Sequence, residues 1–366
     1  MLDALAAAVP PFCPNPACPF HRCGRPGWRY VRTGFYARQC PPRRIQRYRC
    51  LQCARHFSAQ TFSTSYWLKR PELLVPLFHR LLGCSAFRQI AREFEVSPST
   101  VLTHSARLGR HCLLFHELHR PRAAVAEPLA LDSFISFEFS QYWPTAFHLA
   151  AGTRSHFFYG FTDSELRRSG RMTRAQRRRR ASLEERLGRP DPRSVEREVA
   201  GLLGLVAPRP QALELHTDEH QDYPRALVRL RHLQITHRTT SSRAARTVRN
   251  PLFPINLLDL LIRHSGANHK RETIAFSKRR QSAAERLAVL LVWRNYLKSF
   301  SERKRDATPA MRLGLCARRL GVAEVLARRL FVTRIGLPER WGRYYQRAIP
   351  TRQIPHGARH RLRYAA

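Results

Sequence analysis

The pattern of apolar and polar positions divides the chain into four regions and a linker. Residues 1–70 are rich in cysteine, proline and aromatic side chains. Apolar positions over residues 71–120 recur at helical spacing, and residues 121–127 form a linker to the next region. Between residues 128 and 300, short alternating apolar runs such as LALDSFISFEF, AFHLAAGT and SHFFYGFTD predict strands. A basic C-terminal region occupies residues 301–366.

The region from 128 to 300 continues with further strands and then with helices. An Arg-rich insert near residues 165–210, which contains RRSGRMTRAQRRRR, follows the third strand run. The segments ALELHTD and HLQITH predict two more strands on either side of a helical YPRALVRLRHL. From Asn256 onward the pattern is mostly helical, and its longest periodic segment is Ala283–Phe300. This succession of strands and helices predicts an α/β fold class.

Composition adds a large positive charge to this picture. The 366 residues include 65 Lys and Arg against 26 Asp and Glu, which gives a net charge of +39 and an isoelectric point near 11.5. This excess is spread along the whole chain and favours a polyanionic partner, because the charges otherwise repel one another. No run of about 18 apolar residues is present, and the chain does not open on a basic export signal. We therefore expect a cytoplasmic, nucleic-acid-binding protein with no membrane partner.

The cysteines are crowded near the N-terminus, where six of the nine fall within the first 53 residues. They include a C-x4-C pair and a C-x2-C pair separated by a strand-rich segment. Two short loops that supply two thiolates each satisfy the tetrahedral geometry that zinc prefers. The alternative interpretation is a set of free thiols in a loop-rich segment. The expected Zn²⁺ ligands are Cys13, Cys18, Cys50 and Cys53, and the other nearby candidates are His21, Cys23 and Cys40.

The stretch CSAFRQIAREFEVSPSTVLTHSARLGRH predicts a short helix, a turn and a second helix. Ser97 or Ser99 can cap the second helix, and Pro98 is tolerated in its first turn. Next to a basic zinc module this pattern favours a helix-turn-helix whose second helix enters the major groove of DNA. An ordinary helical hairpin is the alternative. The residues expected to face the groove are Ser99, Thr100, Thr103, His104 and Arg107.

Two aspartates stand at the ends of apolar strand runs in this basic chain. Asp132 follows PLAL, and Asp218 ends ALELHTD. Carboxylates on two neighbouring strands jointly bind hard divalent cations, and a pair of Mg²⁺ (or Mn²⁺) ions is the usual arrangement for phosphodiester chemistry. A third carboxylate is expected from a later helix. Asp259 and Glu272 compete for that role, with Asp259 the preferred candidate, and a lone aspartate is otherwise a helix cap or a surface ion pair.

Basic side chains are expected to bind DNA phosphates around these acids. The Arg run at residues 177–180 is a second candidate for DNA contact, and otherwise forms a solvated surface. The aromatic and Arg-rich C-terminus either packs back on the fold or covers DNA; the sequence does not decide between these. The expected phosphate-binding residues are Lys270, Arg271, Lys278, Arg279 and Arg280.

The order of these segments resembles bacterial insertion-sequence transposases of the DDE type. The resemblance extends over about Cys13–Phe331, and its most telling pieces are YRCLQCARHFS, HTDEHQDYPRAL and RETIAFSKRR. It implies a ribonuclease-H-like catalytic domain, a mixed sheet flanked by helices, with the acids on adjacent strands and on a following helix. In the register set by RETIAFSK, Asn256 lies near the position where related enzymes carry a glutamate, and Asp259 is the nearest carboxylate.

From these patterns we expect a DNA transposase that cuts element ends with Mg²⁺ and transfers the freed 3′-hydroxyl to target DNA. The resemblance implies a homo-oligomer that acts on double-stranded DNA, both element ends and target, at the bacterial nucleoid. The alternative is a DNA-binding protein without catalysis, such as a repressor or a domesticated transposase. A nuclease of the same fold that hydrolyses without strand transfer is a third possibility.

Overall fold

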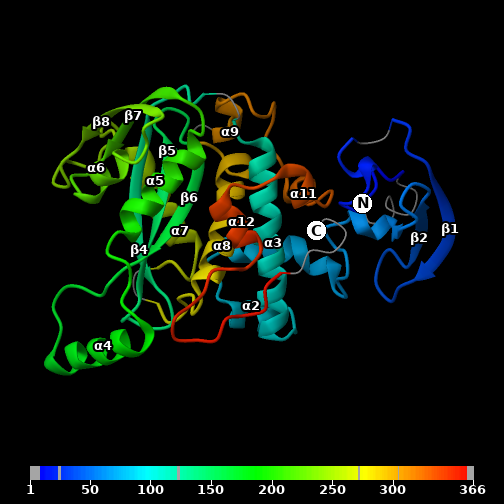
Figure 1. Ribbon diagram of the computed structural model, residues 1–366, viewed down its shortest axis with the longest axis horizontal. Helices are drawn as coiled ribbons and strands as arrows, with labels where there is room; N and C mark the ends of the chain where they lie inside the picture. Colours follow the sequence, from blue (N-terminus) through cyan, green and yellow to red (C-terminus); the bar gives the residue numbers. More distant parts are fainter. Residues whose placement is uncertain (1–8, 24–25, 122–123, 271–272, 304, 361–366) are drawn as a thin grey trace.

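The structure is a computed structural model, and Figure 1 shows its arrangement. It describes residues 9–23, 26–121, 124–270, 273–303 and 305–360. The molecule is elongated: a small N-terminal sheet lies at one end, the long helix α3 runs through the middle, and a larger sheet lies on the far side.

The N-terminal sheet is a three-stranded antiparallel meander. Its strands are β1 (Tyr30–Ala37), β2 (Arg44–Cys50) and β3 (His56–Ser58), flanked by the short helical turns η2 (Pro19–His21) and η3 (Ala59–Phe62). Its hydrophobic cluster is separate from the main core and is built on Trp28, Ile45, Tyr48 and the cysteines. So small a core gives limited stability on its own.

Three helices follow this sheet, introduced by the turn η4 (Pro71–Leu73). They are α1 (Leu74–Leu82), α2 (Phe87–Glu93) and α3 (Pro98–His119). Ser97, one of the two predicted caps, fulfils that role: its hydroxyl accepts a hydrogen bond from the N–H of Thr100 at 3.2 Å. Farther along, α3 packs closely against a later helix, because a side chain at Gly109 would come within 2.5 Å of the carbonyl oxygen of Glu285.

The central sheet has five strands in the order β6-β5-β4-β7-β8. These are β4 (Leu129–Phe137), β5 (Pro144–Gly152), β6 (Phe158–Glu165), β7 (Gln211–Thr217) and β8 (Leu233–Thr239). The first three pair antiparallel as a meander, whereas β7 lies parallel to β4 and β8 lies parallel to β7. The sheet is therefore mixed, as the sequence analysis predicted.

Helices cover both faces of this sheet. Helix α5 (Ser194–Val206) packs on one face, where its Glu198 carbonyl accepts a hydrogen bond from Thr162 of β6. Helix α7 (Phe253–Ser265) covers the other face, where Arg263 lies over the ring of Phe134. Because side chains alternate along strands, the pairing register places Thr162 and Phe134 on opposite faces. The short helix α6 (Asp222–Leu227) lies between β7 and β8 in the sequence.

Two helical segments differ from their sequence patterns in extent. The Arg-rich insert contains a helix, α4 (Arg174–Leu187), whose start is fixed by a reciprocal capping box between Thr173 and Gln176. The helix expected over Ala283–Phe300 instead begins earlier, as α8 (Arg280–Val292). It then widens into one π-helical turn, η5 (Trp293–Leu297).

The C-terminal region packs back onto the sheet, which settles the choice that its sequence left open. It consists of short helices: α9 (Pro309–Arg312), α10 (Val322–Val325), α11 (Val332–Ile335) and α12 (Glu339–Tyr345). The indole N–H of Trp341 donates to the carbonyl of Phe161 at 3.0 Å, on the edge strand β6. One hydrophobic core therefore runs from α1 through the sheet to α12.

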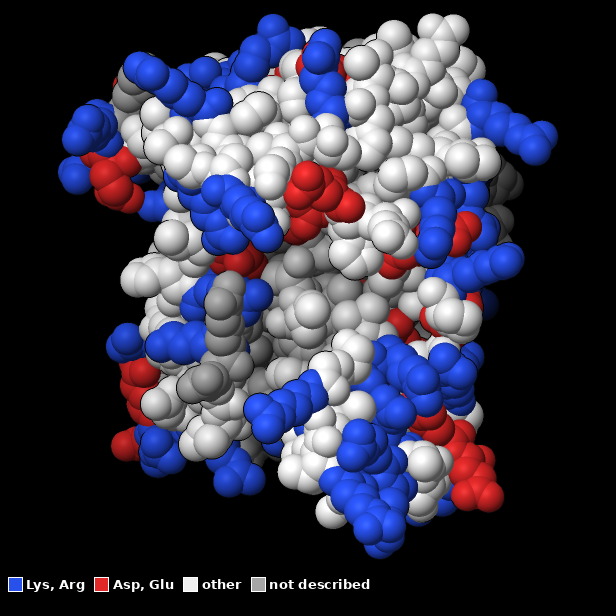
Figure 2. Space-filling view, turned by 90° about the vertical axis from the view of Figure 1, so that its left-hand side faces the viewer, with Lys and Arg blue, Asp and Glu red and all other residues white. Residues whose placement is uncertain are grey.

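Positive charge covers much of the surface. On the face drawn in Figure 2, Lys and Arg side chains gather along the upper edge and at the lower end, where α4 projects below the sheet. Within the described part of the chain, no helix combines the length and apolar character needed to cross a bilayer.

Candidate functional site: the four cysteines and the three aspartates

The four predicted cysteine ligands lie together at the base of the N-terminal sheet. Their sulfur atoms all lie within 4.8 Å of one another, with 3.7 Å between Cys13 and Cys53 and 4.0 Å between Cys18 and Cys50. Thiolates around one tetrahedral zinc ion, each about 2.3 Å from the metal, are about 3.8 Å apart. This group is therefore able to hold a zinc ion.

Local structure positions each cysteine of this group. Cys18 caps the turn η2, and Cys50 ends strand β2, so that a strand end and a turn face each other. Burial opposes ionisation of Cys50, but the indole N–H of Trp28 at 3.2 Å and two backbone N–H groups lower its pKa to about 7. Neighbouring donors thus favour the thiolate of Cys50, the form that binds metal, whereas burial raises the pKa of Cys13 and of Cys18.

The spare candidates take no part in this group. His21 is fully buried, but its Nδ1 contacts the carbonyl of Cys13 at 2.8 Å and its Nε2 contacts the hydroxyl of Thr333 at 2.8 Å. Cys23 is exposed, and Cys40 lies against Arg38 instead. Both ring nitrogens of His21 are therefore engaged, and the Nε2 contact joins the N-terminal module to the C-terminal region.

The predicted aspartates come from three neighbouring elements, two inner strands of the central sheet and the helix that covers one of its faces. Asp132 lies within β4, Asp218 follows the last residue of β7, and Asp259 lies in the middle of α7. Strands β4 and β7 pair in parallel with Ala130 opposite His216. The same register continued by two residues brings Asp132 level with Asp218.

Electrostatic interactions link these three carboxylates as neighbours. Burial, together with the negative charges of Asp218 and Asp259, raises the pKa of Asp132 to about 6. The N–H of Ser133, which donates to Asp132 Oδ1 at 2.7 Å, opposes part of that rise. The cluster therefore concentrates negative charge where solvent is partly excluded, and a cation placed there would relieve it.

Asp259 has one oxygen engaged and one without a partner. Its Oδ2 accepts from Arg263, one helical turn later, at 3.0 Å. Its Oδ1 is buried and has no hydrogen-bond partner among the described residues. Buried carboxylate oxygens are normally satisfied, so an orphaned one next to other carboxylates is a fitting ligand for a hard cation. The rival third acid, Glu272, and the predicted phosphate ligand Arg271 lie outside the described residues.

Sequence reasoning missed several residues around Asp132. Tyr223 of α6 lies beside Asp132 and Asp218, and its hydroxyl hydrogen-bonds to Ser133. Ser133 in turn contacts His148 of β5 at 2.6 Å. The positive charge of Arg246 also acts on Asp132 and lowers its pKa. Of these residues, only Arg246 could have been recognised from the sequence, because it belongs to the basic segment SSRAARTVRN that follows β8.

The predicted groove-facing residues divide into two groups. Ser99 and Thr103 are exposed and Thr100 is half-buried, all in the first part of α3. His104 is instead buried, with Nδ1 against the carbonyl of Thr100 at 2.9 Å. Arg107 turns toward the interior and donates to the carbonyl of Thr64 at 3.0 Å. The expectation of a groove-facing His104 and Arg107 was wrong, because α3 turns this side toward the N-terminal segment and the core.

The basic residues after α7 also differ in their surroundings. Lys270 and Lys278 are exposed, and Arg279 donates to the carbonyl of Pro355 at 2.6 Å. Arg280, predicted to bind phosphates, is only 5% exposed and instead pairs with Asp163 at 3.1 Å. It was misassigned because buried acids that its own segment does not reveal surround its guanidinium.

Comparisons with known proteins establish no family for the chain. No protein-family model matches it, and no curated protein matches it. Among solved structures, it is similar to a chain of the cryo-EM structure of a simian T-cell lymphotropic virus intasome in complex with the PP2A regulatory subunit B56 gamma. That similarity has 14% sequence identity and a TM-score of 0.24, and it covers 62% of this chain and 75% of that chain.

Proposed function

We propose that this protein is a DNA transposase of the DDE type, which cuts DNA strands and joins a 3′-hydroxyl to a new phosphodiester. The observation that supports this most directly is that Asp132, Asp218 and Asp259, from β4, β7 and α7, lie near enough for the charges of Asp218 and Asp259 to act on Asp132. A shared carboxylate site of this kind is what phosphoryl transfer on DNA requires, because the chemistry depends on positioning and on charge neutralisation.

The arrangement of the fold supports the same proposal. A ribonuclease-H-like domain has a mixed sheet with acids on adjacent strands and on a following helix, and here β4, β7 and α7 supply them in that order. We propose that the central region, residues 128–300, is this catalytic domain, with α4 and α5 inserted between its third and fourth strands.

The chemistry of the three aspartates suits divalent cations, although among the described residues only the four cysteines already lie close enough together to hold an ion. Asp132 and Asp218 would hold the metal from the strands, and Asp259 would complete the site with its unpartnered Oδ1. Mg²⁺ supplies Lewis-acid activation of the attacking oxygen and neutralises charge at the leaving oxygen. Arg246, which already acts on Asp132 electrostatically, would contact the DNA phosphate that approaches the carboxylates.

The N-terminal half would supply DNA binding. We propose a zinc ribbon over residues 1–70, with zinc held by the four cysteines. A helix-turn-helix over residues 71–120 would present Ser99, Thr100 and Thr103 to the duplex, since these lie at the start of α3 and retain exposure. The net charge of +39 would contribute sequence-independent attraction to DNA.

A cleavage assay on duplex DNA with Mg²⁺ tests the catalytic proposal. Since the element's end sequence is unknown, the substrate is plasmid DNA that carries the gene with its genomic flanks. Asp132→Asn and Asp218→Asn are each expected to reduce strand cleavage at least about 100-fold, because each removes a metal-binding charge. Asp259→Asn is expected to reduce it similarly.

The matched control is Asp306→Asn, which removes an exposed aspartate far along the chain from the three. It is expected to retain full cleavage, and all four variants should bind DNA about as well as the wild type. Undiminished cleavage by Asp218→Asn would refute the catalytic role. Loss of cleavage in Asp132→Asn and Asp218→Asn but not in Asp259→Asn would reassign the third acid.

One observation favours a second candidate function, DNA binding without catalysis. Arg263 already occupies Oδ2 of Asp259, and this cation partly neutralises the carboxylate that the metal site needs. A non-catalytic protein would bind duplex tightly, with strong salt dependence, and would give no metal-dependent nicking. Measuring binding and cleavage on one preparation separates the two functions.

A further inference from the structure

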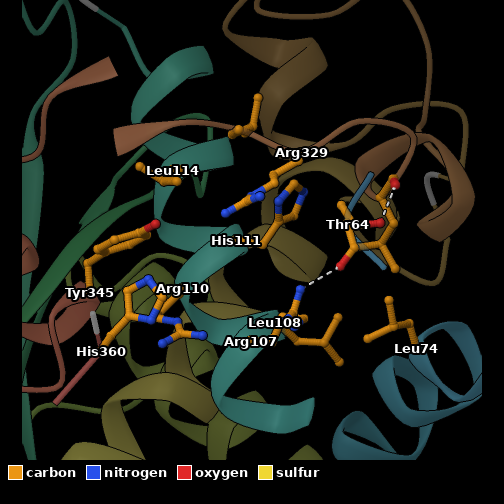
Figure 3. Close-up of a pocket in the computed structure, with 12 residues that line it drawn as sticks. Thr64, Leu74, Arg107, Leu108, Arg110, His111, Leu114, Arg329, Tyr345 and His360 are labelled. Carbon is orange, nitrogen blue, oxygen red and sulfur yellow. Dashed lines mark hydrogen bonds between the residues drawn. The ribbon is translucent and has the colours of Figure 1, made fainter. Parts of the chain in front are cut away.

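A small pocket beside α3 is lined by three arginines. It is bounded by Arg107, Arg110 and His111 from α3, by Arg329 before α11, and by Tyr345 of α12. Figure 3 shows these side chains around one hollow, with Thr64 on the opposite side. None of these elements carries the three aspartates, so the pocket is distinct from the proposed catalytic site.

No carboxylate of the described residues pairs directly with these arginines, although the charge of Glu285, which is paired with Arg347, also acts on Arg110. Among the described residues, none of the three guanidinium groups forms an ion pair with a carboxylate. Arg110 also makes no hydrogen bond within the described part of the chain, and its guanidinium lies 6.0 Å from the ring centre of Tyr345. By contrast, the neighbouring Arg347 is paired with Glu285 at 3.0 Å.

The other two arginines are held in place by neutral groups. Arg107 donates to the carbonyl of Thr64 at 3.0 Å, and Arg329 donates to the carbonyl of Thr61 at 3.1 Å. Arg329 also lies over the ring of Tyr66 at 4.5 Å. These contacts fix two guanidinium groups in position but supply no negative charge, so the pocket has a fixed surplus of positive charge.

This surplus is unfavourable in the absence of an anion. Burial, together with the charges of Arg110 and Arg329, lowers the pKa of Arg107 to about 10. His111 adds no charge at neutral pH, because burial lowers its pKa to about 4. Partly buried cations in proteins are normally paired, and three of them around one hollow without a direct carboxylate partner indicate a missing anion.

The size of the pocket limits which anion fits. Its volume is about 70 Å³. A cavity of roughly 10–15 Å³ on the same measure holds one water molecule, so this one has room for a few waters or one tetrahedral oxyanion. Guanidinium groups match the geometry of phosphate oxygens, to which they donate in pairs.

We propose that this pocket binds a single phosphate group, either as free orthophosphate or as a phosphate of a DNA strand. Arg110 donates to it with its unpartnered guanidinium, and Arg107 and Arg329 supply the flanking charges. The phosphate then joins α3, the segment after β3 and the C-terminal region at one point.

Phosphate binding to the full-length, zinc-loaded protein tests this proposal. The probe is inorganic phosphate, compared with chloride at equal ionic strength, and the readouts are calorimetric affinity and the thermal midpoint. Arg110→Met is expected to weaken phosphate affinity by about tenfold or more, because it removes charge-assisted hydrogen bonds. In phosphate-free buffer this variant should be at least as stable as the wild type, since it relieves repulsion among the arginines.

The matched control is Arg197→Met, which removes an exposed arginine from a surface ion pair with Asp191 and should leave phosphate affinity unchanged. Arg329→Met, in a separate segment, provides a second variant should Arg110→Met fold poorly. Equal phosphate affinities in Arg110→Met, Arg329→Met and Arg197→Met would overturn the proposal. So would a wild-type protein that neither phosphate nor duplex DNA stabilises more than chloride does.

Measuring the binding of duplex DNA by the same variants distinguishes the two sources of the phosphate. If the group belongs to DNA, Arg110→Met weakens duplex binding about tenfold more than Arg197→Met does, and inorganic phosphate competes with the duplex. If it is free phosphate, both variants lose duplex affinity equally while only Arg110→Met loses phosphate. Because phosphate affinity is measured without DNA cleavage, a failure of the catalytic proposal leaves this outcome readable.

Discussion

Asp132 is the residue whose proposed metal-binding role is most costly to the stability of the fold. A carboxylate that is partly buried beside Asp218 and Asp259 is unfavourable in the metal-free protein, and its pKa of about 6 expresses that cost. Apolar residues would pack better at this position in β4. Such destabilised acids cluster where function, rather than stability, determines the residue.

The pKa of Asp132 predicts a specific pH dependence of stability. Its folded-state pKa of about 6 exceeds the ordinary value of 3.8, so the folded protein holds this proton more tightly than the unfolded chain does. The contribution of Asp132 to stability is therefore favourable below about pH 4 and is lost as pH rises through about 6, by about 3 kcal/mol in total. Asn at this position cannot ionise and should escape the loss.

Urea unfolding of the wild type and Asp132→Asn, in magnesium-free buffer at about pH 4.5, 5.5 and 7, measures this effect. As pH rises, the free energy of unfolding of Asp132→Asn should increase relative to that of the wild type. Adding Mg²⁺ should stabilise only the wild type. The comparison cancels other titrating groups, the cysteines included. If the unfolding free energies of the wild type and Asp132→Asn instead change in parallel with pH, the pKa of Asp132 is the same in the folded and unfolded protein.

At the residue scale, the sequence predicted which acids and cysteines come together but not which basic residues are free. Asp132 and Asp218 follow apolar strand runs, which singled them out in the sequence, and the parallel pairing of β4 with β7 brings them level. Arg280 was misassigned because its partners Asp163 and Glu138 lie more than a hundred positions earlier, on the sheet. Whether an arginine faces DNA or a buried acid depends on tertiary contacts that spacing does not encode.

At the scale of elements, the N-terminal sheet depends most on a bound metal. Its cluster contains few buried side chains, and three of them belong to the four-cysteine group. Four thiol groups packed within 4.8 Å contribute little without an ion, whereas zinc coordination supplies folding free energy to modules of this size.

Cys53→Ser is therefore expected to lose the zinc and unfold this sheet while leaving the central sheet folded. The measurement is zinc content per chain, together with amide hydrogen exchange over β1 and β2. Cys23→Ser is the control, because Cys23 is exposed and outside the group, and it should keep one zinc ion per chain. A Cys53→Ser protein with full zinc and protected strands would exclude the four-cysteine site.

The sequence predicted most elements by type, and it erred on where they end. The alternating runs of β4, β5 and β6 and the cap at Ser97 were readable, because period and capping chemistry are local. The π-helical turn after Val292 was not. There, Asn295 leaves the regular helix pattern to bond both backbone groups of Phe158, a contact with a distant strand.

On the scale of the whole molecule, a buried ion network ties the C-terminal region to the sheet. Asp163 of β6 is fully buried, and Arg340 of α12 contacts its Oδ1 at 2.6 Å while Arg280 contacts its Oδ2 at 3.1 Å. Burial opposes ionisation of Asp163, but these two cations hold its pKa below the usual value. Asp163 and Arg340 are far apart in the sequence, so local pattern could not predict this link.

This network leads to a prediction about long-range stability. Arg340→Met removes one of the two cations from a fully buried carboxylate, and breaking such a pair leaves charge without compensation, at a cost of about 3 kcal/mol. The variant should unfold at lower urea concentration than the wild type, with α12 losing hydrogen-exchange protection first. Arg343→Met, on the exposed side of the same helix, removes equal charge and should change stability by no more than about 0.5 kcal/mol. Equal stabilities for the two variants would mean that Arg280 alone neutralises Asp163. The C-terminal region would then be held to the sheet by apolar contacts such as that of Trp341.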